Sequence, residues 1–219
     1  MKHKAGFYER FVKRLLDIVL SAAALVILSP ILAVTAVLVR VKLGSPVIFK
    51  QERPGKNEKI FTLHKFRTMR DARDKNGELL SDGERMTKFG EKLRSMSIDE
   101  LPELYDILRG KMSIVGPRPL LVEYLEYYTE EEHHRHDVLP GLTGLAQVNG
   151  RNNLTWDQKF MYDIDYVNRI SFGLDMKIIV ATIGKVLKQS DVQVNTQNTE
   201  GNLAVIRGSA AINGEVHNT

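Results

Sequence analysis

An uninterrupted apolar stretch near the N-terminus dominates the hydropathy pattern. No charged residue occurs from Ile18 to Val39, a run of 22 positions. A helix of that length rises about 33 Å, which is enough for the ~30 Å hydrocarbon layer of a membrane. A cleaved signal peptide is a poor interpretation, because the run is long and contains Ser29-Pro30 in place of a small-residue cleavage site. The pattern therefore predicts a membrane-bound chain.

Two features of this run favour a re-entrant helix hairpin over a single span. Ser29 and Pro30 lie at its middle, where proline removes a backbone hydrogen bond and kinks or breaks a helix. Both flanks are basic, and a hairpin that turns at this pair returns both to the cytoplasm, where Lys and Arg collect. A kinked spanning helix is the alternative, since membrane helices tolerate proline. The basic positions are Lys2, Lys4, Arg10, Lys13 and Arg14 before the run and Arg40, Lys42, Lys50 and Arg53 after it.

A second amphipathic pattern lies in Leu174–Lys188. Its apolar residues share one helical face and its lysines occupy the other, which is typical of a basic helix lying in a membrane interface. An ordinary helix packed on a soluble core fits the same pattern. The apolar positions are Met176, Ile179, Val180, Ile183, Val186 and Leu187, and the basic ones are Lys177, Lys185 and Lys188.

The rest of the chain reads as mainly helical with a small β element. β-prone stretches on either side of Arg53–Asn57 predict a β-hairpin. The fold class is therefore α+β, with a membrane-associated segment at 1–45, a cytoplasmic or interfacial domain at 46–190 and a flexible polar tail at 191–219. The predicted strands are Val47–Gln51 and Lys59–Leu63, the predicted mobile loop is Arg70–Lys88, and the predicted helices are Phe89–Met96, Leu101–Leu108, Leu121–His136 and Trp156–Asn168, with a turn-forming stretch at Leu139–Arg151.

Composition narrows the choice of partners. The formal charge is +4, which favours anionic partners such as phosphates, acidic lipids or nucleic acid. The chain has no cysteine, which excludes a disulfide framework, cysteine-ligated zinc and thiol catalysis. A soluble nucleic-acid binder is disfavoured by the apolar run and by the lack of a recognition motif. A membrane-tethered scaffold that holds anionic lipid stays open.

The most distinctive polar motif is the residue pair Asp99-Glu100, which lies at a predicted helix start. Acidic residues and Ser97 are a common way to begin a helix, and Ser97 with Glu100 has the spacing of a capping box. The functional alternative is a carboxylate pair beside free backbone N–H groups, able to ligate magnesium or to attack phosphorus.

A diphosphate substrate also needs cations. The candidates are Lys65, Arg67, Arg94 and Arg118, the last held between two prolines. Other polar residues fit structural roles better: Asp163, Asp165 and Tyr166 as hydrogen-bonded groups, and His133, His134 and His136 as a solvated cluster rather than a metal site.

Across about Phe11–Asp191, a series of sequence motifs resembles those of the small bacterial sugar transferases, the monotopic polyprenyl-phosphate phosphoglycosyl transferases. So many long motifs in the same order make a chance similarity implausible. The matching motifs are Lys13–Asp17, Ser29-Pro30, Pro46–Phe49, Gln51–Gly55, Lys65–Met69, Ser97–Leu104, Met112–Pro119, Pro140–Arg151 and Tyr166-Val167.

The resemblance implies a two-step reaction at the cytoplasmic face of the bacterial inner membrane. Asp99 would attack the β-phosphate of a UDP-sugar, release UMP and hold the phosphosugar, which polyprenyl (undecaprenyl) phosphate would then accept. Glu100 would assist, either by deprotonating the acceptor or by positioning Mg²⁺, which would bridge Asp99 and the diphosphate. Lys65, Arg94 and Arg118 fall on family positions that resemble phosphate binders. A glycosyl transferase that releases UDP is the nearest alternative.

The resemblance also implies a monotopic enzyme that breaks its re-entrant helix at Ser29-Pro30, contacts membrane lipids and acts at the first membrane step of a glycan pathway. It implies no nucleic acid partner. The identity of the sugar and the existence of a homodimer stay open.

Overall fold

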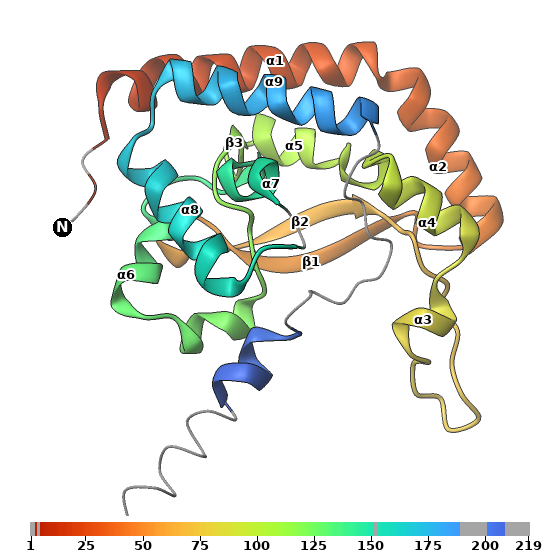
Figure 1. The fold of residues 1–219 in the computed structure, drawn as a ribbon. Coiled ribbons are helices and arrows are strands. Elements are labelled where there is room, and N and C mark those ends of the chain that lie inside the picture. The colour runs from red at the N-terminus through yellow and green to blue at the C-terminus, as the bar shows by residue number, and fades with distance from the viewer. Residues whose placement is uncertain (1–2, 4, 151–152, 189–200, 209–219) are drawn as a thin grey trace, which may run out of the picture.

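In the computed structural model, which describes residues 3, 5–150, 153–188 and 201–208, two long helices from opposite ends of the chain lie side by side (Figure 1). These helices are α1 (Arg14–Ile27) and α9 (Phe172–Lys188), and both cover a small β-hairpin and a set of short helices. The α+β class, mainly helical, is confirmed.

The helix does break at the predicted pair, but it does not fold back on itself. The π-helical turn Tyr8–Lys13 runs into α1, and α2 (Ser29–Leu43) follows at a bend of 63°. Pro30 cannot donate to the carbonyl of Val26, and the Ser29 hydroxyl donates to that oxygen instead, at 2.8 Å. Because Leu32 still bonds to Leu28, the chain re-enters a helix at once. The arms therefore form a bent pair rather than a tight hairpin, and no single described helix is long and apolar enough to cross a membrane.

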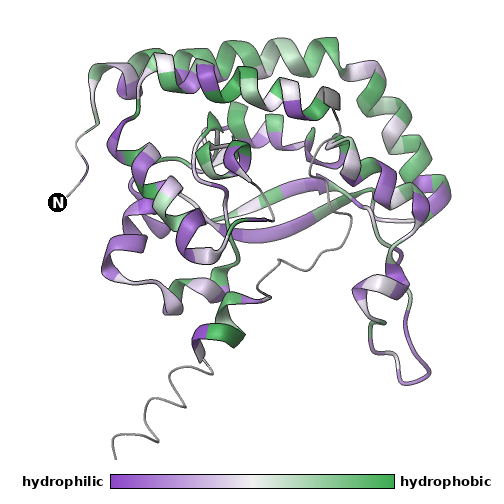
Figure 2. Ribbon diagram, in the orientation of Figure 1, coloured by the Kyte–Doolittle hydropathy of each residue, from purple (hydrophilic) through white to green (hydrophobic). Residues whose placement is uncertain are grey.

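The outer side of this bent pair is apolar and exposed. Figure 2 shows hydrophobic residues along both arms. Exposed apolar surface of this extent on one face is typical of a protein or membrane contact. The exposed residues include Phe11, Leu15, Val19, Val26, Ile27, Val34, Val37 and Val41.

Charged residues of α1 and of the π-helical turn before it hold this helix to the rest of the fold. Lys13 pairs with Asp175 of α9 at 2.6 Å, and Asp17 accepts hydrogen bonds from the Ser113 hydroxyl and the Ile114 backbone. The Arg14 guanidinium donates to two carbonyls at the C-terminal end of α5 (Glu103–Leu108), at 2.7 and 2.9 Å. The apolar arm is thus tied directly to the helix that follows Asp99-Glu100.

The predicted β-hairpin is confirmed, with longer strands than expected. β1 (Ile48–Pro54) pairs antiparallel with β2 (Ile60–Phe66), with Phe49 opposite Lys65 and Arg53 opposite Phe61. Directly opposed residues in an antiparallel pair share a face, as do alternate residues of one strand. Gln51, Arg53 and Lys65 therefore lie on one face of the hairpin.

A second, parallel strand pair was not predicted. β3 (Ser113–Val115) forms where no element was expected, and it pairs with β4 (Gly141–Thr143), which lies within the stretch expected to be turn-forming. Three glycines allow their backbones to approach: a Cβ on Gly141 would lie 2.1 Å from the Gly116 nitrogen, and one on Gly144 2.2 Å from the Gly116 oxygen. Strands of three residues leave too little pattern to read from sequence.

Most predicted helices form, with one clear exception. The expected helix Leu121–His136 is wrong: it divides into the 3₁₀ helix Val122–Tyr127, α6 (Glu130–His133) and a 3₁₀ turn His134–His136, because Thr129 caps a new helix in a reciprocal bond with Glu132. The other helices are α3 (Asp82–Arg85), α4 (Lys88–Ser95), the 3₁₀ turns Lys56–Glu58 and Ile98–Glu100, α7 (Leu145–Asn149) and α8 (Trp156–Asn168).

Helix α9 packs on the fold through one side and exposes apolar residues on the other. Ile178 and Asp175 are buried against the fold, and Thr182 bonds Thr143 at 2.7 Å. Val180, Ile183 and Val186 are exposed on the other side, and an interfacial position of this helix stays a prediction. The side chains of Leu187 and Lys188 lie outside the described residues.

Part of the expected flexible tail is packed instead. Residues 203–208 form a helical turn in which Leu203 is fully buried against Tyr124, Tyr128, Trp156 and Phe160. Arg207 makes a two-bond ion pair with Glu132, at 2.6 and 2.7 Å. The remaining tail positions, 191–200 and 209–219, and Arg151 lie outside the described residues.

Candidate active site

The Asp99-Glu100 pair lies in a single 3₁₀ turn between α4 and α5. Ser97 enters this turn in the left-handed region, with φ of 54°, which is unfavourable for a side chain with a Cβ. Ser97 forms no side-chain cap, and the Glu100 side chain points to cations instead. The capping alternative is therefore wrong, and the turn serves to present the two carboxylates.

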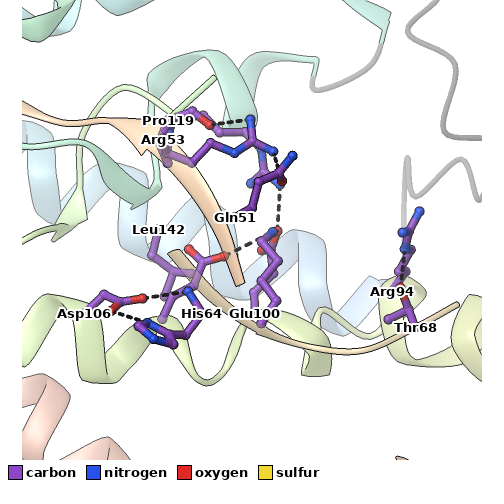
Figure 3. A network of polar contacts seen from close by, with 12 residues as sticks. Gln51, Arg53, His64, Thr68, Arg94, Glu100, Asp106, Pro119 and Leu142 are labelled. Carbon is purple, nitrogen blue, oxygen red and sulfur yellow. Dashed lines mark hydrogen bonds and ion pairs between the residues drawn. The ribbon is translucent and has the colours of Figure 1, made fainter. Parts of the chain in front are cut away.

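Glu100 is clamped between two cations. Its Oε1 accepts a hydrogen bond from Lys65 Nζ at 2.8 Å and one from Arg118 Nη2 at 2.7 Å (Figure 3). Burial alone would raise the pKa of Glu100, but Arg118 and Lys65 outweigh it and hold this pKa well below its usual range. Glu100 is thus a fixed anion and a weak base.

Asp99 is the opposite case. The residue is only 8% exposed, and within the described part of the chain no group forms a hydrogen bond or ion pair with its carboxylate. Burial, followed by the charge of Glu100, raises the pKa of Asp99 to about 6, against the pull of Lys65, Arg94 and Arg118. A carboxylate that is surrounded by cations yet paired with none remains able to react.

Lys65 serves two carboxylates at once. Besides Glu100, its Nζ lies 3.1 Å from Oε1 of Glu103 on α5. Burial raises the pKa of Glu103 to about 7, although Lys65 lowers it. Sequence reasoning missed Glu103, and the signal was its position one helical turn after Asp99-Glu100.

The other predicted cations divide into two groups. Arg118 and Arg94 both lie in the field of Asp99, and Arg94 Nε donates to the Thr68 hydroxyl at 3.0 Å. For Arg67 the structure gives only a backbone bond to Val47, so its phosphate-binding role stays a prediction. The structure therefore brings Lys65, Arg94 and Arg118 to the dyad.

A buried ion pair positions the loop that carries Arg118. Arg135 pairs with Asp163 at 2.7 Å, with both side chains almost fully buried, and its Nη2 also donates to the Arg118 carbonyl at 2.7 Å. The predicted structural role of Asp163 is confirmed. Asp165 is likewise hydrogen-bonded and accepts from Arg169. The Tyr166 hydroxyl lies within hydrogen-bond distance of Asp175 and of the Val115 carbonyl. In the histidine cluster, His133 bonds Glu58 and His134 bonds Asp137, and both are partly exposed. The expected solvated position is wrong for His136, which is buried and stacks on Tyr128.

The donor set suits magnesium only together with a substrate. Within residues 3, 5–150, 153–188 and 201–208, no group of three or more His, Asp or Glu side chains is arranged to hold a metal ion. Glu100 and Glu103 are engaged by Lys65, which leaves Asp99 as the available carboxylate. One carboxylate plus phosphate oxygens and water is a usual environment for Mg²⁺, so these residues fit an ion that arrives with a diphosphate.

Comparison with known proteins decides the family. The sequence profile described as "Bacterial sugar transferase" matches residues 8–189, which include every element from the bent pair to α9. The chain belongs to the bacterial sugar transferase family. The resemblance inferred from the motifs is confirmed, and it covers the apolar arms, the dyad and the three cations around it.

Named relatives agree with this assignment. This sugar transferase is 52% identical over 181 residues to "Uncharacterized sugar transferase EpsL" of Bacillus subtilis (strain 168), covering 83% of this chain and 90% of that protein. It is 40% identical over 189 residues to a "UDP-glucose:undecaprenyl-phosphate glucose-1-phosphate transferase" of Xanthomonas campestris pv. campestris. It is 35% identical over 185 residues to a "UDP-N-acetylgalactosamine-undecaprenyl-phosphate N-acetylgalactosaminephosphotransferase" of Aeromonas hydrophila. The alignments cover 81% of this sugar transferase but only 39% and 44% of the latter two proteins.

Proposed function

We propose that this sugar transferase moves a sugar-1-phosphate from a UDP-sugar to polyprenyl phosphate, with Asp99 as the nucleophile and UMP as the leaving group. The observation that carries the proposal is the contrast within the dyad: Glu100 is held by two cations, whereas Asp99 is buried, surrounded by three cations and paired with none of the described groups. The names of the relatives support this donor and acceptor class.

The proposed reaction consists of two successive displacements at the β-phosphorus of the donor. An Asp99 carboxylate oxygen attacks the β-phosphorus, the bond from that phosphorus to the bridging oxygen breaks, and UMP departs with the electron pair. The product is a mixed anhydride between Asp99 and the sugar phosphate. A phosphate oxygen of the polyprenyl phosphate then attacks the same phosphorus and restores the Asp99 carboxylate.

The cations support these steps by neutralising charge. Lys65 and Arg118, which Glu100 orients, can bind the equatorial phosphate oxygens as negative charge develops. Arg118 is about half-exposed, with 43% of its side chain accessible, so a substrate can reach it. When bound, Mg²⁺ would be held by Asp99 and the diphosphate and would supply further charge neutralisation.

Glu100 acts as a positioning residue in this proposal rather than as a general base. Its pKa is held low by Arg118 and Lys65, so it has little tendency to take a proton. The acceptor needs no base near neutral pH, because the second pKa of a phosphate monoester is about 6.

The bent pair suits a position within one leaflet of the membrane. If both arms leave the same surface at equal inclination, a bend of 63° places each at about 30° to the membrane plane. Arms of about ten apolar residues then reach roughly 8 Å below that surface. Polyprenyl phosphate is dissolved in the bilayer and the donor in water, so a shallow anchor at the cytoplasmic face brings both to Asp99.

The test is nucleotide release by purified full-length protein in detergent, with Mg²⁺, polyprenyl phosphate and a panel of UDP-sugars. We expect UMP from wild type with one sugar and none from Asp99→Asn. When the donor carries ³²P in its β-phosphate, we expect label on wild type alone, and hydroxylamine should remove it because it cleaves a mixed anhydride. Release of UDP would show ordinary glycosyl transfer. UMP release undiminished by Asp99→Asn would refute the role of Asp99.

A further inference from the structure

An arginine on β1 lies close to the site without an anionic partner. Arg53 shares the face of the hairpin that carries Lys65, four residues along the paired strands, or about 13 Å between backbone positions. Its Nη2 donates to the Gln51 side chain at 2.6 Å, and its Nη1 makes a long bond of 3.4 Å to the Pro119 carbonyl. Its Nε is buried and has no hydrogen-bond partner within the described structure.

The charge around Arg53 is positive. Burial, then the neighbouring Arg118 guanidinium, lowers the pKa of Arg53 to about 10. No carboxylate lies within ion-pair distance of Arg53 in the parts of the chain that the structure describes, and nearby Glu103 is engaged by Lys65. The other buried arginine near this loop, Arg135, has a buried partner in Asp163. Of the two neighbouring guanidinium groups, only Arg118 has a carboxylate within ion-pair distance among the described residues, so the two together are suited to bind a further anion.

The cations lie on two sides of the dyad. Figure 3 shows Arg53 and Gln51 on one side of Glu100, and Arg94 with Thr68 on the other. Arg94 responds to the charge of Asp99, whereas the charges that act on Arg53 are those of Arg118, Glu103 and two tyrosines. Arg53 is therefore the more remote cation, beyond Arg118 as seen from Asp99.

The membrane side of the site is the Arg94 side. Arg94 belongs to α4, whose Leu93 packs with Val39 and Leu43 of α2, the second arm of the bent pair. A lipid-borne acceptor approaches from that arm. It carries a single phosphate followed by an apolar chain, so it has no second anion to offer Arg53.

We propose that Arg53, together with Gln51 and Arg118, binds the α-phosphate of the nucleotide donor and takes no part in binding the acceptor. This inference rests on the proposed function, and it identifies the residues that bind the nucleotide end of the UDP-sugar donor. A nucleoside diphosphate extends beyond the phosphorus that Asp99 attacks, and Arg53 supplies the charge at that extension. The site then recognises UMP as a leaving group and leaves the Arg94 side to the polyprenyl phosphate.

The first experiment measures binding without turnover. Affinities for UMP and for uridine are compared by calorimetry in wild type, Arg53→Gln, Arg53→Lys and the control Arg73→Gln, whose arginine lies on the exposed loop 54% accessible. Loss of one charged hydrogen-bond donor to phosphate predicts UMP binding weaker by about 10- to 100-fold in Arg53→Gln, with uridine affinity unchanged. Arg53→Lys should retain part of the UMP affinity and Arg73→Gln all of it. Equal UMP affinity in wild type and Arg53→Gln would overturn the assignment.

The second experiment separates the half-reactions. In Arg53→Gln we expect kcat/KM for UMP release from the UDP-sugar to fall by about 10- to 100-fold. Transfer from the isolated phosphosugar-enzyme to polyprenyl phosphate should stay within about twofold of wild type. An equal loss in both halves would show a general structural role and overturn the proposal. Failure of wild type to release UMP would refute the proposed function, while the UMP and uridine affinities would still decide the α-phosphate site.

Discussion

Replacing Asp99, the proposed nucleophile, should make the protein more stable while it abolishes the proposed reaction. Asp99 is almost fully buried, and burial with the charge of Glu100 raises its pKa from the ordinary value of 3.8 to about 6. The folded state therefore binds the proton more tightly than the unfolded state does. Ionisation of Asp99 thus opposes folding above pH 6, and this penalty disappears as the pH falls from 6 towards 3.8.

The size of the effect follows from the same values. The difference between 3.8 and about 6 corresponds to about 3 kcal/mol of unfolding free energy when Asp99 is ionised. Asp99→Asn removes the charge and keeps the shape, so at pH 7.5 it should recover most of this. For a chain of this size, that is a rise in melting temperature of about 5–10 °C.

The assay is thermal unfolding in detergent at pH 7.5, 6 and 4.5, followed by circular dichroism. The matched variant is Glu100→Gln, for which we expect the opposite change in melting temperature. Arg118 and Lys65 lower the pKa of Glu100, so the loss of its charge should lower the melting temperature at pH 7.5. A lower melting temperature for Asp99→Asn at pH 7.5 would refute the reasoning. So would a gain in stability that is as large at pH 4.5 as at pH 7.5.

Three further outcomes test other parts of the structure. The kcat/KM for UMP release should rise with pH to a plateau above about 6, because Asp99 must be ionised to attack; a flat profile from pH 5 to 8 would contradict this. Leu203→Ala should lower the free energy of unfolding, measured with denaturant, by about 2–5 kcal/mol, because Leu203 is fully buried. The control Val205→Ala, at a residue that is 67% exposed, should lower it by less than about 1 kcal/mol, and equal losses would show that residues 201–208 do not pack as described. Val37→Asp on the exposed side of α2 should reduce flotation with lipid vesicles, and Thr62→Asp on the hairpin should not; equal flotation would argue against lipid contact by α2.

Sequence predicted the elements whose signals are local. The β-hairpin was predictable because a turn-forming stretch separates two β-prone runs. Helix α8 was predictable because Thr155 and Gln158 form a capping box directly before an amphipathic run. The divided segment 121–136 was not, because its pattern of charges also suits a helix, while burial of Tyr124 and Tyr128 in a shared cluster favours the break. The β3–β4 pair depends on a close contact between segments far apart in sequence.

The same distinction applies to the site. The adjacency of Asp99 and Glu100 was visible in the sequence, and the family resemblance gave Asp99 its role. Which carboxylate is held and which is left unpaired was not visible, because it depends on Lys65, 35 positions from Glu100, and on Arg118, 18 positions away. Arg53 was interpreted as part of a basic flank, of a turn and of a family motif, but not as a site residue, since nothing local shows that it lacks an anionic partner.

The 63° bend has a consequence for the choice of membrane. A spanning helix must match its apolar length to the full thickness of the bilayer, and each ångström of mismatch costs free energy. A bent pair whose apolar arms end at mid-leaflet has no opposite surface to reach. In the proposed anchoring, the bend and the contacts of Lys13, Arg14 and Asp17 with the fold would set its depth, rather than the length of the lipid chains. A protein anchored in this way is expected to tolerate bilayers of different acyl-chain length with little change in the position of Asp99.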